Sequence, residues 1–183
     1  AQGVWSPDGQ RLVYQRLSME TGETSGNNSL WWLNPETGES APVFQDEGLS
    51  GFNPRWSPDG QWLSYTAPGG TGLQLYNLQD GRSHTIPNRA GAPVVWRTDS
   101  SAPVTSDIVE QNGGFVTHLF YFDLSTETLT NLSGPLNVVD SNTAWSTNGE
   151  RLVWVRREIK STDGSAGNQI WQMQADGTGA EPL

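Results

Sequence analysis

A five-residue segment recurs four times along the chain, and this repeat constrains the fold more than any other feature. Residues 5–9 and 56–60 both read Trp-Ser-Pro-Asp-Gly, residues 145–149 read Trp-Ser-Thr-Asn-Gly, and residues 96–100 read Trp-Arg-Thr-Asp-Ser. The four Trp residues are separated by 51, 40 and 49 positions. Self-similarity at such a period is typical of repeat architectures, in which each repeat is one supersecondary unit.

Each repeat predicts the same series of short strands and turns. A strand leads into the Trp, and a tight turn follows, because Pro presets its own φ, Asp accepts backbone hydrogen bonds and Gly tolerates positive φ. Period-two alternation after the turn predicts a second strand, and a third strand follows a polar loop of variable length. A short fourth strand closes each unit. Second strands are predicted at 11–14, 61–65 and 151–154, and third strands at 30–34, 73–77, 119–123 and 170–174. No window shows the spacing of an amphipathic helix.

The third repeat departs from this pattern. Arg97, Thr98 and Ser100 replace the Ser, Pro and Gly of the turn, and Pro103 stands where a Leu of the second strand is expected. Because Pro cannot donate to a sheet ladder, we expect a shifted or bulged second strand around residues 104–108.

Four short antiparallel strands per repeat predict an all-β fold, a β-propeller built of four-stranded antiparallel blades, with four blades in this chain. The Trp-Ser-Pro-Asp-Gly turn, the apolar strand after it and the Leu- or Ile-aromatic strand ending in Asn or Asp resemble the TolB-like propeller repeat, also called the WD40-like Pro-Asp repeat. The resemblance covers residues 1–183 as a single propeller domain or propeller segment, with blades at about 1–48, 49–90, 91–134 and 135–183. A closed four-bladed ring, a piece of a larger propeller and two chains completing one ring all fit the sequence.

Composition limits the partners and the chemistry. Twenty acidic against ten basic residues give a net charge of −10, which repels phosphate backbones, so we expect no nucleic acid partner. No apolar run approaches the ~20 residues that span a bilayer, so we expect no membrane insertion. The chain has no Cys, and its two histidines, His84 and His118, lie in predicted outer strands. Without a nucleophile elbow, a P-loop or a zinc motif, we expect no catalytic residue, cofactor or metal site.

The long loops offer the candidates for binding. In a propeller blade, the loop between the second and third strands and the connection to the next blade emerge on one face, and long loops on a rigid scaffold commonly carry binding. The candidate partner-binding residues on this loop face are Asp46, Glu47, Phe52, Arg89, Asn137, Asp140, Asn142, Arg157, Lys160 and Asp163. The oxygen-rich pairs Asp46 with Glu47, and Asp140 with Asn142, could also coordinate calcium.

Three hypotheses of function follow. We favour a protein that is not an enzyme: a protein-binding or assembly scaffold that presents its loops to a protein partner and can self-associate to complete a larger ring. The first alternative is the propeller accessory domain of a prolyl-oligopeptidase-like serine peptidase, since similar propellers precede the α/β-hydrolase domain of such enzymes and filter their substrates. The second is a carbohydrate- or calcium-binding propeller. The resemblance to TolB implies an extracytoplasmic location, periplasmic, cell-surface or secreted.

Overall fold

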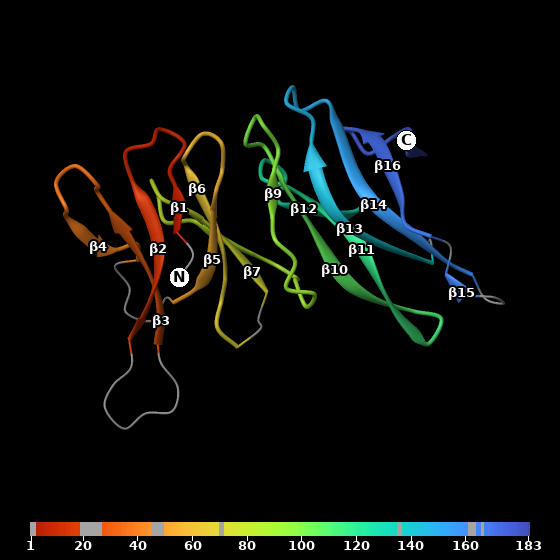
Figure 1. The fold of residues 1–183 in the computed structure, drawn as a ribbon, viewed down its shortest axis with the longest axis horizontal. Helices are drawn as coiled ribbons and strands as arrows, with labels where there is room; N and C mark the ends of the chain where they lie inside the picture. The colour runs from red at the N-terminus through yellow and green to blue at the C-terminus, as the bar shows by residue number, and fades with distance from the viewer. Residues whose placement is uncertain are drawn as a thin grey trace. The chain divides into compact units, whose positions relative to one another are not determined.

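A computed structural model describes residues 3–18, 27–44, 50–69, 72–134, 137–160, 164–165 and 167–183. The described residues form strands and turns and no helix, which confirms the all-β fold class. Accordingly, none of them belongs to a helix that could cross a membrane. The chain divides into two compact units, Ala1–Pro87 and Asn88–Leu183, each containing two of the repeats (Figure 1).

The first unit holds two four-stranded antiparallel sheets, one for each of its repeats, with the strands in sequence order. The sheet of the first repeat contains β1 (Gly3–Trp5), β2 (Leu12–Ser18), β3 (Asn27–Leu33) and β4 (Ser40–Pro42). The sheet of the second repeat contains β5 (Phe52–Trp56), β6 (Trp62–Thr66), β7 (Leu73–Asn77) and β8 (Ser83–Ile86). The second and third strands that the sequence predicts in these repeats are confirmed.

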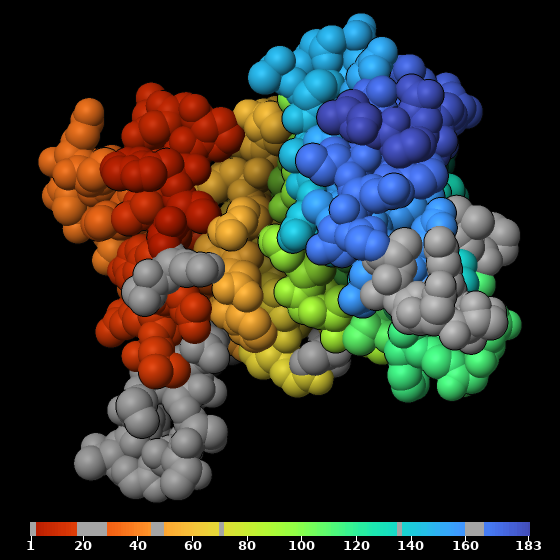
Figure 2. Space-filling view, turned by 45° about the vertical axis from the view of Figure 1, so that its right-hand side comes forward, coloured from red at the N-terminus to blue at the C-terminus, as the bar shows by residue number. Residues whose placement is uncertain are grey.

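The core of the first unit lies between its two sheets. Val13 and Leu30 of the first sheet and Leu63 and Tyr65 of the second are buried together with Phe44. The ring centroid of Phe44 lies 4.9 Å from that of Tyr65, so the aromatic side chains pack directly on one another. Figure 2 shows the red and orange segments of the first sheet against the yellow segments of the second, and β5 contacts β1, β2 and β3. Side-chain alternation along the strands places these apolar residues on the facing sides of the sheets.

The second unit forms one nine-stranded sheet with the order β17-β16-β14-β13-β11-β10-β9, in which β12 also pairs with β11 and β15 with β14. The third repeat supplies β9 (Val95–Trp96), β10 (Pro103–Gln111), β11 (Gly114–Asp123) and β12 (Thr128–Asn131). The fourth supplies β13 (Val138–Trp145), β14 (Arg151–Lys160), β15 (Gly164–Ser165), β16 (Gln169–Gln174) and β17 (Glu181–Pro182). A parallel bridge between Thr117 and Val139 joins the two sets. The prediction of separate four-stranded blades therefore holds for the first two repeats, while ring closure and the number of blades stay predictions.

The third repeat has a regular second strand, so the prediction of a shifted or bulged one is wrong. Strand β10 pairs with β11 without a register shift from Val104 opposite Tyr121 to Gln111 opposite Gly114. Pro103 is the first residue of β10, a position that tolerates the missing N–H. The hairpin turns at Asn112 and Gly113, whose φ angles of 52° and 76° suit a two-residue turn with positive φ at both positions.

Candidate functional site

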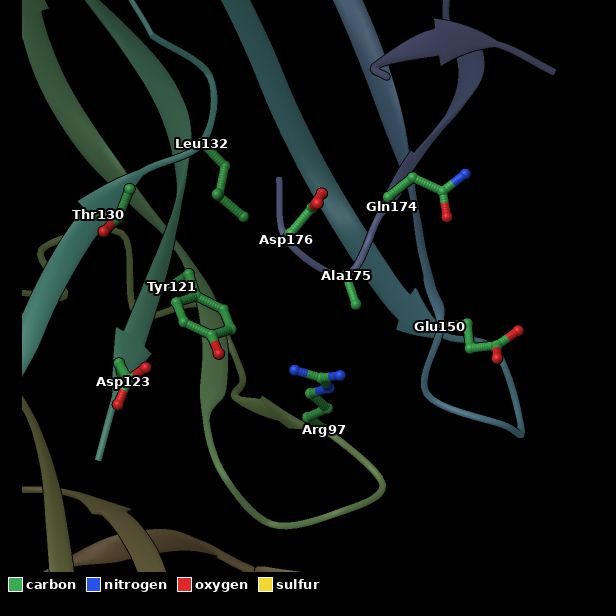
Figure 3. Close-up of a pocket in the computed structure, with 9 residues that line it drawn as sticks. All are labelled: Arg97, Tyr121, Asp123, Thr130, Leu132, Glu150, Gln174, Ala175 and Asp176. Carbon is green, nitrogen blue, oxygen red and sulfur yellow. The ribbon is translucent and has the colours of Figure 1, made fainter. Parts of the chain in front are cut away.

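A pocket of about 830 Å³ lies in the second unit where turns of its third and fourth repeats meet (Figure 3). It is bounded by the turns after β9, β11 and β16 and the turn before β14. The lining residues are Arg97, Tyr121, Asp123, Thr130, Leu132, Glu150, Gln174, Ala175 and Asp176. The partner-binding residues predicted from the sequence were expected on the face with the long loops, and none of them lines this pocket.

Two of the pocket carboxylates are held in place by the turns that carry them. Oδ1 of Asp123 accepts hydrogen bonds from the Ser125 hydroxyl at 2.6 Å and from the backbone N–H groups of Ser125 and Thr126 at 2.8 and 3.1 Å. Oδ1 of Asp176 accepts from the hydroxyl and the N–H of Thr178 at 2.6 and 2.9 Å. The hydrogen bonds from Ser125 and Thr178 lower the pKa of Asp123 and of Asp176, respectively, so both carboxylates are ionised at neutral pH.

Arg97 brings a positive charge to this acidic pocket. Its guanidinium carbon lies 5.7 Å from the ring centroid of Trp145, and its Nε lies 3.3 Å from Oδ2 of Asp99. Figure 3 shows the Arg97 and Tyr121 side chains among the carboxylates of Asp123, Glu150 and Asp176. A pocket with three carboxylates, one guanidinium and one phenol can bind a polar ligand that carries both an ammonium group and hydrogen-bond acceptors.

A departure from the repeat pattern marks this pocket in the sequence. Arg97 stands where the first, second and fourth repeats carry Ser6, Ser57 and Ser146. In those repeats the Ser hydroxyl closes the turn by accepting a backbone N–H five residues later, as at 2.9 Å from Arg11 to Ser6. The replacement of Ser by Arg in a single repeat is the signal in the sequence that could have indicated this pocket.

Asp140, one of the predicted loop residues, lies within β13 and is 0% exposed. Its carboxylate accepts two hydrogen bonds from Arg156, from Nε to Oδ1 at 2.8 Å and from Nη2 to Oδ2 at 2.6 Å. The Ser133 hydroxyl and the Trp154 indole N–H also donate to it, at 2.6 and 3.0 Å. The guanidinium carbon of Arg156, which is itself 3% exposed, lies 4.6 Å from the ring centroid of Trp171. Asp140 is therefore the centre of a buried ion pair and not an exposed loop contact.

Asn142 and Phe52 lie at irregular points of the first strands of their repeats. The register of β13 shifts between Ser141 and Ala144, and Asn142 has a φ of 53°. The register of β5 shifts in the same way after Phe52. Asp140 and Asn142 both line a second cavity of about 490 Å³. Both carboxylate oxygens of Asp140 already accept the hydrogen bonds described above. The described residues contain no group of three acidic or His side chains suited to a metal ion.

The other predicted candidates are dispersed. Arg89 is exposed, and its guanidinium donates to the carbonyl of Ile108. The Asn137 side chain donates to the carbonyl of Ile159 at 3.1 Å, and Arg157 is exposed on β14. Asp46, Glu47, Asp163 and the side chain of Lys160 lie outside the described residues. The candidates therefore do not gather into one described site.

The sheets and the turns define a propeller-type fold, and comparisons with known proteins support this class. TolB from Acinetobacter baumannii matches with a TM-score of 0.62 at 19% identity, covering 100% of this chain and 43% of that chain. The dipeptidyl peptidase 4 of Porphyromonas gingivalis matches with a TM-score of 0.68 at 11% identity, covering 98% and 32%. The β-propeller domain of the Trilobed protease from Pyrococcus furiosus matches with a TM-score of 0.63 at 12% identity, covering 100% and 55%. Likeness at this level shows the fold alone.

A curated relative adds sequence similarity. The protein named "Uncharacterized peptidase YuxL" of Bacillus subtilis (strain 168) is 34% identical over 73 residues. These residues are 39% of this chain and 11% of that protein, so the chain spans only a small part of this relative. No family model matches the chain.

These comparisons correct two sequence-based expectations. The favoured hypothesis of a non-catalytic assembly scaffold is wrong, because the curated relative, which is similar in sequence, is named as a peptidase. Parts of the tricorn protease, of a prolyl endopeptidase and of dipeptidyl peptidase 4 have the same fold, which is consistent with this correction. The expectation that the protein is not an enzyme is corrected by the same findings. They favour the alternative of a propeller associated with a peptidase.

Proposed function

We propose that this chain is the propeller part of a peptidase-related protein and helps to select or position peptides for a prolyl-oligopeptidase-like serine peptidase. The observation that carries the proposal is the 34% identity over 73 residues to a protein named as a peptidase. The propeller folds of a prolyl endopeptidase and of an acylaminoacyl peptidase from Pyrococcus horikoshii support it. An extracytoplasmic location is a further proposal, which rests on the likeness to TolB.

The pocket of the second unit suits a peptide. The ionised carboxylates of Asp123 and Asp176 attract the ammonium group of a peptide N-terminus or a basic side chain. Arg97 and the Tyr121 hydroxyl can donate hydrogen bonds to peptide carbonyls. We infer that this pocket is a peptide subsite and that the bond-breaking residues belong to the peptidase part.

The first test of this proposal uses the native protein, isolated from its source cells with an antibody raised against these 183 residues. We expect a fluorophosphonate probe to label a serine in the isolated protein, and we expect it to hydrolyse peptide p-nitroanilides. The absence of both serine labelling and peptide hydrolysis would contradict the proposal.

The pocket is tested with Arg97→Ala and Tyr121→Phe in the same native protein. Each removes a hydrogen-bond donor to a peptide carbonyl: the charged guanidinium of Arg97 is worth ~1.5 kcal/mol and the neutral hydroxyl of Tyr121 ~1 kcal/mol. The value of kcat/KM for longer peptides should therefore fall about tenfold in Arg97→Ala and about fivefold in Tyr121→Phe. The control is Arg151→Ala, because Arg151 lies in the same unit, outside the pocket, and bonds Gln172. An equal change of kcat/KM in all three variants would show that the pocket has no part in the proposed function.

A further inference from the structure

The chain contains two Asn-Gly pairs, the dipeptide at which an Asn side chain most readily loses its amide nitrogen. The pairs are Asn112-Gly113 and Asn148-Gly149. Gly favours this reaction because it has no Cβ to hinder the approach of its backbone nitrogen to the Asn side chain. Both Asn residues are exposed, and the two glycines have similar φ angles of 76° and 71°. Only the hydrogen bonds and the packing of the two turns therefore distinguish the two sites.

The reaction, deamidation, begins when the backbone nitrogen of the Gly attacks Cγ of the Asn side chain. The new N–C bond closes a succinimide ring, the Gly nitrogen loses its proton, and the side-chain nitrogen leaves as ammonia. Water then opens the ring at one or the other carbonyl carbon and leaves aspartate or isoaspartate, with no oxidation or reduction. The attack requires that the Asn side chain can turn toward the Gly nitrogen and that this nitrogen is free to react.

The turn of the fourth repeat holds both reacting groups of its Asn-Gly pair. Oδ1 of Asn148 accepts the Ser146 hydroxyl at 2.7 Å and the N–H of Glu150 at 3.2 Å. Its Nδ2 donates to Oε2 of Glu150 at 2.7 Å. The N–H of Gly149 donates to the carbonyl of Ser146 at 2.9 Å. An attack on Asn148 therefore has to break these hydrogen bonds first.

Packing restricts the same turn further. Gly149 is buried although Asn148 is exposed, and a Cβ built on Gly149 would overlap Oγ1 of Thr98 in the turn after β9. The third repeat therefore leaves little room for the backbone of Gly149 to move toward the Asn148 side chain.

The turn between β10 and β11 restrains neither reacting group. Asn112 and Gly113 are the two loop residues between Gln111 and Gly114, which pair in the ladder. Within the part of the chain that the structure describes, neither the Asn112 side chain nor the N–H of Gly113 forms a hydrogen bond. Apart from the neighbouring residues, no atom lies within 4 Å of the position that a Cβ of Gly113 would take. The Asn112 side chain can therefore turn toward Gly113 without breaking a contact.

We propose that Asn112 is a site of spontaneous deamidation in the folded protein and that its turn protects Asn148 from the same reaction. The product adds a negative charge to the tip of the β10–β11 hairpin. Aspartate keeps the turn, because Asp-Gly also suits positive φ at both positions. Isoaspartate lengthens the backbone of the loop, so the pairing of Gln111 with Gly114 no longer fits a two-residue turn. This inference is independent of the proposed peptidase function.

The test follows both sites in the native protein, isolated with an antibody against these 183 residues and incubated in mildly alkaline buffer. Peptide mapping by mass spectrometry detects the exchange of NH2 for OH at each Asn. We expect Asn112 to react about a hundredfold faster than Asn148, because the hydrogen bonds of the Asn148 turn add to its barrier. A ratio below about tenfold, or no reaction at Asn112, would overturn the proposal.

The same incubation in concentrated urea is the control for the sequence around each pair. Unfolding removes the hydrogen bonds and the packing, so Asn112 and Asn148 should then react at similar rates. A difference as large as in the folded protein would place its cause in the neighbouring residues and would contradict the role of the turns.

The variant Ser146→Ala tests the protection of Asn148 directly. It removes the hydroxyl that donates to Oδ1 of Asn148, so deamidation of Asn148 should become about fivefold faster. Asn112 should keep its wild-type rate and is the internal control. Glu150→Ala, which removes the acceptor of Nδ2, is the second variant. Unchanged rates at Asn148 in both variants would refute the protection, and if a variant also accelerates Asn112 through unfolding, the wild-type comparison decides.

Discussion

The ion pair between Asp140 and Arg156 shows how a single residue depends on its surroundings. Both side chains are buried, and the carboxylate accepts hydrogen bonds from Arg156, Trp154 and Ser133. Ser133 follows β12 of the third repeat, while Asp140 lies in β13 of the fourth. The hydrogen bond from Ser133 therefore ties the connection between the two repeats to the sheet. Arg156 supplies the counter-ion without which the buried charge of Asp140 would be costly.

We expect Arg156→Met to lower the free energy of unfolding by about 3–5 kcal/mol, because it leaves the Asp140 carboxylate buried without its counter-ion. The double variant Asp140→Leu with Arg156→Met should lose much less, since no buried charge remains. Urea unfolding measures both. Arg157→Met, at the neighbouring exposed position, is the matched control, and an equal loss in Arg156→Met and Arg157→Met would refute this account of the pair.

At the scale of the element, the Ser-Pro-Asp-Gly turn is a small hydrogen-bonded unit between two strands. The Ser6 hydroxyl donates to Oδ1 of Asp8 at 2.5 Å, and Asp8 also accepts the N–H of Gln10 at 3.0 Å. The second repeat reproduces the Ser–Asp bond at 2.5 Å with Ser57 and Asp59. The fourth repeat keeps the contact with Asn in place of Asp and without Pro, so the Ser and the Asp or Asn matter more than the Pro.

We expect Ser6→Ala to raise the pKa of Asp8 toward its ordinary value of 3.8, because the Ser6 hydroxyl is the largest cause of its lowering. A lowered pKa in the folded state stabilises the fold above the unfolded pKa and loses this contribution as the pH falls through the folded pKa. The variant should therefore lose less stability than the wild type on acidification below about pH 4. An NMR titration of the Asp8 carboxyl checks the shift, with Ser40→Ala as control, and an unchanged pKa in Ser6→Ala would disprove it.

At the scale of the whole molecule, each unit has a core of its own. Leu63 belongs to the core of the first unit and Leu152 to that of the second, and both are completely buried. Local opening of a protein follows such cooperative units. The chain is therefore expected to respond to damage in one core mainly within that unit.

We expect Leu152→Ala to destabilise the second unit by about 2–5 kcal/mol through the lost burial and the cavity left behind. Hydrogen exchange followed by mass spectrometry should then show a larger acceleration, relative to the wild type, in β10, β11, β14 and β16 than in β6 and β7. Leu63→Ala should produce the reverse pattern. Equal acceleration in both units for either variant would show that the two cores open together.

The local repeat was predictable from the sequence because its causes are local. Alternation along a strand and the hydrogen bonds of a Ser-x-Asp turn involve residues within a few positions of one another. The strands of the first two repeats were therefore found close to their observed bounds. The second strand of the third repeat was predicted wrongly, because the effect of Pro103 depends on its place in the strand and Pro103 is the first residue of β10. The prediction also did not consider Asn112 and Gly113, which form the turn of the β10–β11 hairpin.

The site depended on contacts between residues far apart in the chain. Arg97 lines a pocket with Asp123, Glu150 and Asp176 only because turns of two repeats meet, and Asp140 is buried only because Arg156 pairs with it across the sheet. The sequence by itself determined the repeat, the strands and the turns, because these follow from neighbouring residues. The tertiary structure alone decided which polar side chains are exposed, paired or gathered in a pocket, because burial and charge pairing are set by strand register and by the packing of one sheet on another.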